Sequence, residues 1–485
     1  MEADAPEFIS IRRFSSYRGV DDQFMTEEDE KDYEQFLEGI EFFLKLDVRE
    51  HMEHIKRHKE DAFCTIRHFS GTGSASCTRD GMQGLRSLVQ RRVKTKHDGK
   101  NFAVDEVVQC VSDQIGPGLR DGTERGESPE AIFERVYAQA LKSVQGRQKQ
   151  RTYHFPCVLA GAKSPEQFSI GPVQFTISSL FRSRLLTLNP QEKKFSERVQ
   201  DPELLEYIQK FGWIVSVEVP SCSEAVSKER AELAARTAIN IVRVWFGLGH
   251  GGRMRLVHTE PATSGFSRFL VEADEEISES WSRKFEGASV VDGWFDQIVP
   301  GNVRHHKIAS WLLRDIVYEE RSEMVDRLID ALSWFGDAAF EPSPGAKVAK
   351  LAMLLERLTA TNLAVTKRFS KRRFCRRVAI LGARDGDDLT ARYWAAYNFY
   401  NARSEIAHGA KSQFVGDHWN ELQQAQETIT NCLFQAMEVY SLFRFPLPGG
   451  PKTLGAFFDQ QENRSSALWK ILDAELVRKD GARGF

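Results

Sequence analysis

Two residues near the C-terminal end of the chain, Arg403 and His408, have the types and spacing for chemistry on an anion. A guanidinium binds an anion through parallel hydrogen bonds, and an imidazole has an unperturbed pKa near neutrality. On an ideal helix, five residues turn by about 140°, so the two side chains converge only where the helix ends near His408 or where the arginine reaches around it. Gly409 follows directly and is predicted to end the helix.

The element that must position this pair is a predicted helix over residues 389–409. Apolar residues recur along it in steps of three and four, and Arg403 takes a place on this covered face. A guanidinium is too costly to bury without a partner, so Arg403 should face an anion, an interface or a cavity. Spacing alone also allows another interpretation, in which Arg403 pairs with a carboxylate of the bundle and His408 only caps the helix.

The segment from about residue 325 to residue 445 resembles the HEPN superfamily, whose mark is an arginine and a histidine separated by four to six residues. In its Apea-like branch a tyrosine-bearing helix runs into Arg-Ser-x-x-x-His-Gly, and residues 400–409 read YNARSEIAHG. Residues 327–335 resemble the opening helix of that branch. Residues 350–358 resemble its second helix, with Glu356 at the acidic position. Ser404 follows the arginine where much of the wider superfamily carries Asn, Asp or His.

This resemblance implies a metal-independent endoribonuclease that needs no cofactor. Arg403 would hold the scissile phosphate and His408 would act as general acid or base. The ribose 2′-hydroxyl would attack the adjacent phosphate and leave a 2′,3′-cyclic phosphate. The resemblance also implies a homodimer through the bundle, with both Arg/His sets lining one cleft. The supporting residues would be Glu356, Asn401, Ser404 and Glu405.

The same resemblance implies a biological role. HEPN nucleases with this layout often act as toxins or abortive-infection effectors against phage, with RNA such as tRNA as the substrate. The large part of the chain before the bundle would then be a sensor or brake that answers to a phage-derived trigger.

A basic run precedes the Arg/His helix, with seven Lys and Arg among residues 367–377. Two phenylalanines and a cysteine interrupt it, so one face is expected to pack while the other offers cations. The alternative is that these side chains are solvated or paired with Asp385, Asp387 and Asp388. The residues predicted to contact an RNA backbone are Lys371, Arg372, Arg373, Arg376 and Arg377.

The composition is that of a globular protein with two or three domains, with 485 residues, 41% hydrophobic and 28% charged. A net charge of -3 means that any contact with nucleic acid must be local. No apolar run approaches the roughly 18 residues of a membrane span, so no membrane contact is expected. Seven scattered cysteines without a CxxC pair predict reduced thiols in a cytoplasm.

The periodicities predict a mainly α fold with a β-containing middle region, in which an α+β N-terminal part precedes a C-terminal α-helical HEPN bundle. We expect a mostly helical region over 1–150, an α+β domain over 151–304, the bundle over 305–450 and a tail with one helix over 451–485. Within the first region, Thr26 and Ser128 are predicted helix N-caps. Residues 71–100, glycine- and serine-rich and then basic, and residues 113–126, rich in glycine and aspartate, are predicted to be mobile loops. The alternative for the basic part of the first stretch is contact with a phosphate backbone.

Two local features of the first 300 residues bear on function. The glycines over 247–252 follow a predicted helix, whereas a phosphate loop needs the order strand, loop, helix, so they are interpreted as a helix stop. The second feature is a group of His and Cys residues whose spacing allows zinc but fits no standard zinc module. For these residues we prefer the interpretation of a charged helix followed by a cysteine in the core. The members of this group are His51, His54, His58, Cys64 and His68.

Three functions therefore stand at this point. The first is the endoribonuclease, without a metal at its site. The second is a non-catalytic helical module that binds RNA or protein through the same cleft. The third is a metal-dependent enzyme that uses the histidines and cysteines of residues 51–77.

Overall fold

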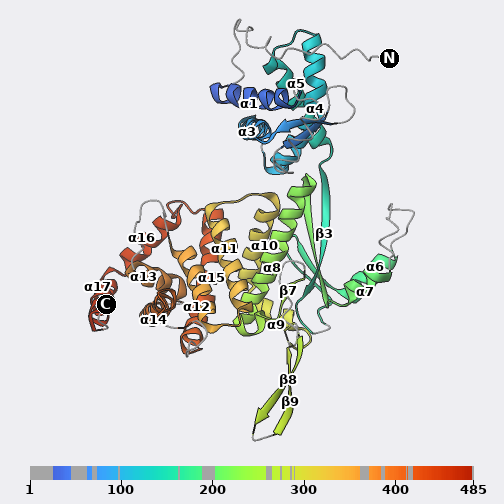
Figure 1. The fold of residues 1–485 in the computed structure, drawn as a ribbon. Coiled ribbons are helices and arrows are strands. Elements are labelled where there is room, and N and C mark those ends of the chain that lie inside the picture. Colours follow the sequence, from blue (N-terminus) through green and yellow to red (C-terminus); the bar gives the residue numbers. More distant parts are fainter. Residues whose placement is uncertain are drawn as a thin grey trace. The chain divides into compact units, whose positions relative to one another are not determined.

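The chain forms two compact units, one of residues 1–151 with 220–229 and one of residues 152–219 with 230–485 (Figure 1). The fold comes from a computed structural model. The prediction of a mainly α protein with a β-containing region is confirmed. Residues that the sequence divided at 304 and 450 lie together in the second unit. The structure describes the chain except for residues 1–25, 45–62, 68–73, 97–98, 162–163, 188–201, 258–264, 274–275, 285–286, 289, 361–370, 384–387, 411, 413–418 and 483–485.

In the described part of residues 1–151, four helices surround one apolar core. They are α1 (Glu27–Leu44), α3 (Arg79–Lys96), α4 (Val104–Glu124) and α5 (Pro129–Gly146). A short antiparallel hairpin of β1 (Phe63–Arg67) and β2 (Ser74–Thr78) and the 3-10 turn η3 (Gly99–Asn101) complete it. Each of the four helices contributes fully buried side chains to the core, including Phe36, Leu88, Val111 and Phe133.

Both predicted caps of this unit are confirmed. Asp29 donates its backbone N–H to Thr26 Oγ1 at 3.2 Å, and Thr26 donates its own to Asp29 Oδ2 at 3.1 Å. This reciprocal pair satisfies N–H groups at the start of α1 that have no partner within the helix. At α5, Ser128 Oγ accepts from the Ala131 N–H, and proline takes the first helical position.

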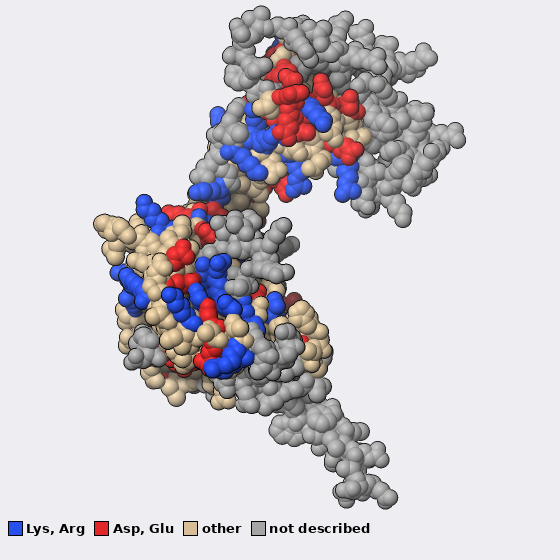
Figure 2. Space-filling view, turned by 90° about the vertical axis from the view of Figure 1, so that its left-hand side faces the viewer, with Lys and Arg blue, Asp and Glu red and all other residues tan. Residues whose placement is uncertain are grey.

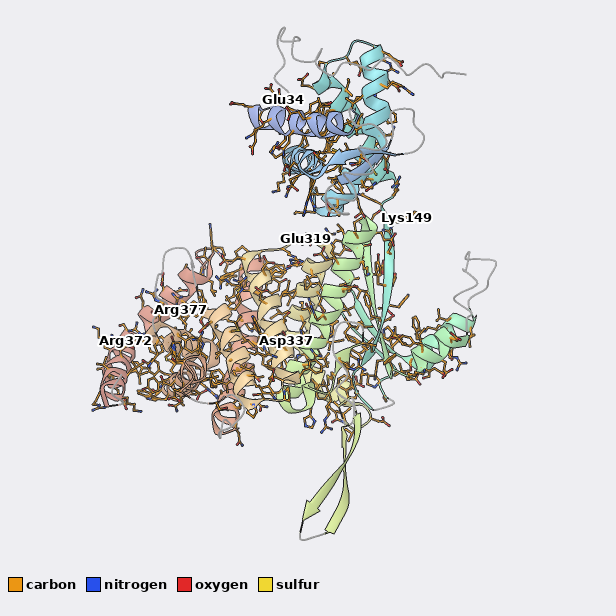
Figure 3. All side chains as sticks on the ribbon, viewed as in Figure 1. Glu34, Lys149, Glu319, Asp337, Arg372 and Arg377 are labelled. Carbon is orange, nitrogen blue, oxygen red and sulfur yellow. The ribbon has the colours of Figure 1, made fainter. Side chains whose placement is uncertain are left out.

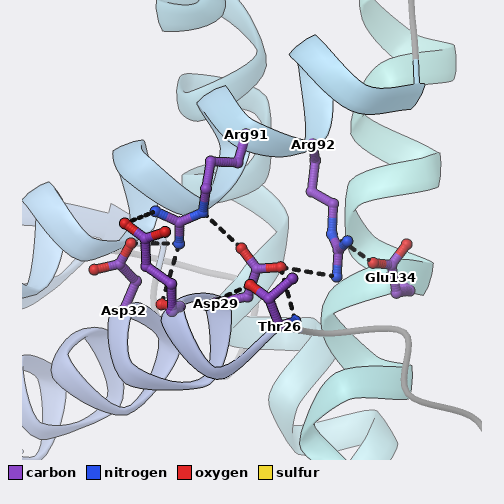
Figure 4. Close-up of polar contacts among 7 residues, drawn as sticks. Thr26, Asp29, Asp32, Arg91, Arg92 and Glu134 are labelled. Carbon is purple, nitrogen blue, oxygen red and sulfur yellow. Dashed lines mark hydrogen bonds and ion pairs between the residues drawn. The ribbon is translucent and has the colours of Figure 1, made fainter.

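The Asp29 carboxylate also joins α1 to α3 (Figure 4). Arg91 Nε donates to Asp29 Oδ1 at 2.7 Å, and Arg91 Nη2 donates to Asp32 Oδ2 at 2.5 Å. Arg92, the next residue of α3, lies 2.9 Å from Glu134 of α5 and 3.6 Å from Asp29. One cluster of charges therefore ties three helices together.

The two glycine-rich stretches predicted to be loops are largely helical, so both predictions are wrong. α3 covers residues 79–96 because its other face is apolar and buried, with Leu85, Leu88 and Val89 fully covered. α4 continues to Glu124 because its glycines permit close packing. A Cβ at Gly118 would collide with Val136 of α5, and one at Gly122 with Ile132. Glycine here serves helix contact rather than mobility.

The second unit begins with a five-stranded sheet in the order β4-β5-β6-β3-β7. Its strands are β3 (Lys149–Val158), β4 (Gln167–Ile170), β5 (Val173–Ile177), β6 (Trp213–Cys222) and β7 (Arg255–Leu256). A separate antiparallel ribbon is formed by β8 (Gly265–Ala273) and β9 (Glu276–Lys284). The helices of this region are α6 (Ser178–Thr187), α7 (Pro202–Gln209), α8 (Glu224–Gly251) and α9 (Trp294–Gly301).

The predicted stop in α8 is confirmed. Gly247 has φ 74° and ψ 172°, which no residue inside a helix adopts, and one more turn follows it to Gly251. The glycines over 247–252 therefore interrupt and end a helix.

The remainder of the second unit is a helical bundle (Figure 1). The long helix α15 packs against all of α10 to α14. Among the described helices, none has the length and apolar character needed to cross a membrane. The bundle helices are α10 (Val303–Tyr318), α11 (Glu323–Phe340), α12 (Pro344–Thr359), α13 (Lys371–Gly382), α14 (Leu389–Ala407) and α15 (Trp419–Arg444).

The tail forms two helices, α16 (Leu454–Arg464) and α17 (Ser466–Ala482), rather than the single helix expected. The first arises because Thr453 caps it through a bond from the Ala456 N–H, and because Leu454 and Phe458 bury one of its faces. Both tail helices pack against α13. The tail is therefore part of the bundle.

Candidate functional site

The end of α14 has the geometry that the sequence indicated. Its last helical residue is Ala407, His408 is the C-cap, and Gly409 has φ 74°. The Gly409 N–H donates to Ile406 O at 3.1 Å and the Ala410 N–H donates to Glu405 O at 2.8 Å. This is the Schellman arrangement, which needs a residue with positive φ after the cap. The predicted stop is confirmed, and the His408 side chain is exposed at the helix end.

Arg403 lies half-buried against α12. Its Nη2 is 3.5 Å from Glu356 Oε1, and each of the two side chains is 32% exposed. Arg403 is thus paired with a bundle carboxylate, and His408 caps the helix, as the alternative interpretation of the spacing held. At 3.5 Å and with this exposure the pair is loose and screened by solvent, so it contributes little to stability. An anionic ligand can compete with Glu356 for the guanidinium.

The other predicted supporting residues differ in their surroundings. Ser404 is half-exposed, and its backbone oxygen accepts from the His408 N–H at 3.0 Å. Glu405 is also half-exposed. Asn401 is 8% exposed, and its side-chain NH2 donates no hydrogen bond within the described part of the chain. Buried donors are nearly always paired, and none of the described residues supplies an acceptor for the Asn401 amide.

Tyr400, the first residue of the segment YNARSEIAHG, lies near Arg403 and Glu356. Burial raises the pKa of its hydroxyl, Arg403 lowers it, and Glu356 raises it further. The ring also contacts Phe374 of α13, with centroids 5.2 Å apart. Tyr400 therefore connects the end of α14 that carries Arg403 with the start of α13.

The start of α13 lies beside the end of α14, because the two helices pack in opposite directions. The Lys371 ammonium lies 5.2 Å from the Tyr397 ring and 6.0 Å from the Tyr400 ring. Arg372 and Arg373 follow and are exposed. These three predicted RNA-contacting residues are thus at the same end of the bundle as Arg403.

Arg376 and Arg377 are held by the tail instead. Figure 3 labels Arg377 and Arg372 among the side chains of the bundle. Arg376 forms a bidentate pair with Asp473 of α17, and Arg377 Nε donates to Glu462 of α16 at 3.2 Å. Arg377 is only 4% exposed and burial lowers its pKa, despite the nearby Glu462. Both guanidiniums hold the tail against α13, because their partner carboxylates lie in α16 and α17.

The alternative partners of the basic run were three aspartates. Asp385 and Asp387 lie outside the described residues, as do Lys367 and Arg368. Asp388 binds Arg392 of its own helix, with Oδ2 2.7 Å from Nε.

Within the described residues no group of three or more His, Cys, Asp or Glu is placed to hold a metal ion. Of the candidate zinc ligands, Cys64 lies in β1, where it pairs in register with Cys77 of β2. The candidate histidines of residues 51–68 lie outside the described part of the chain.

A cavity of about 350 Å³ lies elsewhere in the bundle, between α10, α11, α15 and the start of α16. None of the predicted site residues lines it. The buried Asp315 lines the cavity, accepts a hydrogen bond from Tyr440 Oη at 2.5 Å and forms an ion pair with Arg444. Burial raises the pKa of Tyr440, and the adjacent Asp315 raises it further. Because these partners lie more than 120 residues apart, the sequence held no local signal of the cavity.

No family model, no curated protein and no solved structure matches this chain. The function is therefore argued from the residues at the end of α14 and from their surroundings.

Proposed function

We propose that this chain is a metal-independent endoribonuclease whose reaction takes place at Arg403 and His408. The observation that carries the proposal is the end of α14, where Gly409 stops the helix and leaves an exposed imidazole one turn beyond a half-exposed guanidinium. The rise of about 7.5 Å between the two positions is within the combined reach of the side chains around one phosphodiester.

The surroundings of the pair also support an anionic substrate. Three cations at the start of α13, Lys371, Arg372 and Arg373, lie at the same end of the bundle. Among the residues that the structure describes, none accepts from the buried Asn401 amide, and a substrate or a second copy of the chain would supply this acceptor. A homodimer that closes over the exposed end of α14 is part of the proposal.

In the reaction, the ribose 2′-oxygen attacks the adjacent phosphorus as His408 accepts the hydroxyl proton. Arg403 binds the non-bridging oxygens and stabilises the charge that builds on them. The bond from phosphorus to the 5′-oxygen breaks, that oxygen takes up a proton from water, and His408 releases its proton to the solvent. The products are a 2′,3′-cyclic phosphate and a free 5′-hydroxyl. DNA is not a substrate because it lacks the nucleophile.

Glu356 is a positioning residue in this scheme. Its loose pair with Arg403 holds the guanidinium near the helix end until a phosphate replaces the carboxylate. A Glu356→Gln variant should therefore bind RNA at least as tightly and turn over more slowly.

The biological role we propose is that of an effector against phage, with residues 1–304 as the part that senses a phage-derived trigger. Expression of the full chain with and without phage infection tests this role. Cellular RNA, with tRNA as one candidate, should be cut when the trigger is present.

The chemical proposal is tested by incubating the purified chain with total RNA in EDTA. Arg403→Ala and His408→Ala should each reduce cleavage by about 100-fold or more, the range for losing a general acid–base or an electrostatic group. Matched controls are Arg253→Ala and His250→Ala, both exposed side chains near the end of another helix, α8. The controls should cleave like the wild type.

The outcomes separate the rival functions. Cleavage that persists in both site variants refutes the proposed site, and cleavage lost only in EDTA indicates a metal enzyme. RNA binding that needs Arg403 but yields no products, in infected as in uninfected cell extract, indicates the non-catalytic module. The Arg403–Glu356 pair and the capping role of His408 favour that second candidate.

A further inference from the structure

We propose that the outer surface of α13, α16 and α17 binds the backbone of single-stranded RNA beside the candidate site. This inference rests on the proposed function because it takes RNA as the substrate. The surface, called the basic face below, consists of the exposed residues Arg372, Arg373, Arg464, Lys470, Arg478 and Lys479.

The charge of these three helices differs from that of the whole chain. α13, α16 and α17 carry nine Lys and Arg and five Asp and Glu, a net charge of +4, whereas the chain carries -3. Figure 2 shows this side of the second unit, where Lys and Arg gather in patches beside a narrow line of Asp and Glu. A local excess of this kind attracts a polyanion even when the whole protein is acidic.

Two acidic residues of the tail, Glu462 and Asp473, are turned toward the helix interfaces, whereas Asp459 of α16 is exposed. Glu462 and Asp473 are 19% and 13% exposed and bind Arg376 and Arg377. Glu475 is the acidic residue that reaches the outer cations, at 4.0 Å from Arg478 and 3.7 Å from Lys479.

The internal pairs leave several outer cations without carboxylates. Arg372, Arg464 and Lys470 form no ion pair with any described residue. Tertiary packing thus places Glu462 and Asp473 at the helix interfaces and leaves most of the cations outside.

The tail holds its cations in a fixed position relative to α13 and α14. Trp469, Leu472 and Leu476 of α17 are almost fully buried. Asp473 also accepts from the Tyr393 hydroxyl of α14 at 3.1 Å. The basic face is therefore rigidly joined to the helix that carries Arg403, and binding there can feed the same strand into the site.

Single-stranded RNA fits this face better than a lipid surface because aromatic rings lie among its cations. The Lys479 ammonium lies 3.7 Å from the centre of the half-exposed Trp394 ring. Lys371, at the start of α13, lies over Tyr400 in the same way. Cations beside exposed aromatic rings are the arrangement that holds single strands, by pairing with phosphates and stacking with bases.

The test measures binding without cleavage. The probe is a fluorescent 2′-O-methyl oligonucleotide of about 20 uridines, long enough for several binding sites and lacking the nucleophile. The full chain carries Arg464→Gln, Lys470→Gln and Arg478→Gln together. The matched control carries Lys210→Gln, Arg236→Gln and Arg253→Gln, three exposed cations of α8 and of the turns after α7 and α8. Thermal unfolding confirms that both variants fold.

Loss of three phosphate contacts should weaken binding about 10- to 100-fold near 0.1 M salt, since each single-strand contact adds about 0.7 to the slope of log K against log salt. That slope should fall by about 2, and the control should match the wild type. Equal affinity and slope in both variants would overturn the inference. The inference would also be overturned if the triple variant of the basic face lost binding to vesicles of equal parts phosphatidylcholine and phosphatidylserine but bound the RNA probe as tightly as the wild type.

Failure of this inference and failure of the proposed function are distinguishable. An enzyme that cleaves RNA through His408 but binds the probe equally well in both variants retains the function and loses the basic face. A chain that binds the probe through the basic face but never cleaves RNA retains the face as a binding surface and loses the nuclease.

Discussion

Replacing Asp29 with asparagine should unfold the first unit at a lower denaturant concentration and leave the second unit unchanged. Asp29 is 3% exposed, and its two oxygens serve three partners. It accepts from Arg91 Nε at 2.7 Å and from the Thr26 N–H at 3.1 Å, and it lies 3.6 Å from Arg92. Asparagine keeps one acceptor oxygen but removes the charge.

The size of the loss in stability depends on the ion pairs that Arg91 and Arg92 keep in the Asp29→Asn variant. Removing one partner of a buried pair costs about 3–5 kcal/mol when the other charge is left alone. Here Arg91 keeps Asp32 at 2.5 Å and Arg92 keeps Glu134 at 2.9 Å, so we expect about 2 kcal/mol. With a denaturant dependence of about 2 kcal/mol per molar urea, the midpoint should fall by about 1 M.

The distribution of tryptophan makes the assay selective. All nine tryptophans lie at residue 213 or beyond and outside 220–229, so tryptophan fluorescence reports only the second unit. Far-UV circular dichroism reports both units. Amide hydrogen exchange in α1 and α3 should also accelerate in the variant, because the free energy of local opening becomes smaller. Glu34→Gln is the control, since it removes a charge from an exposed position of α1 and should change stability by under about 0.5 kcal/mol.

The same variant carries a pH test. Burial raises the pKa of Asp29, but the bonds from Arg91 and Thr26 outweigh it and hold that pKa below its ordinary value. The carboxylate therefore stabilises the first unit fully above its unfolded pKa of about 3.9, and the contribution is lost as pH falls through the lower folded value. The difference between wild type and Asp29→Asn should persist from neutral pH to about pH 4 and shrink below it. A tryptophan transition that moves as far as the dichroism signal, or a difference that persists in strong acid, would refute this reasoning.

Two further variants test the bundle. Asp473→Asn should lower the stability of the second unit by about 1–2 kcal/mol, because it weakens the half-buried pair with Arg376 but keeps an acceptor for Tyr393, and tryptophan fluorescence in urea measures it. The exposed Asp459→Asn is its control, and equal midpoints would contradict the role of the pair. Gly409→Ala should cost about 1 kcal/mol, since φ is 74° and nothing lies within 4 Å of an added Cβ, and it should slow RNA cleavage by displacing His408. Gly409→Asn tolerates positive φ and should restore much of both losses, so an alanine variant as stable and active as the asparagine variant would count against the cap.

Features that act within a few residues were predictable from the sequence. The Thr26 and Ser128 caps and the end of α14 at Gly409 all depend on hydrogen bonds over short spans. That Arg403 needs a partner followed from its place on a covered face.

Glycine misled the prediction of the first unit because its two uses look alike in sequence. Gly118 and Gly122 were taken as signs of a loop, but they let α4 approach Val136 and Ile132 of α5. A missing side chain can serve mobility or contact, and only the neighbouring helix decides between them.

The sequence by itself determined the helix starts at Thr26 and Ser128, the helix end at Gly409, that the chain is mainly α, and that Arg403 and His408 share one helix end. Those facts follow from backbone hydrogen bonds and side-chain periods that span at most a few residues. Only the tertiary structure decided which charges find partners. Glu462 and Asp473 reach Arg377 and Arg376 across 85 and 97 residues, and this contact turns two predicted RNA ligands into internal pairs. Ion pairing depends on distance in space, and packing alone sets that distance.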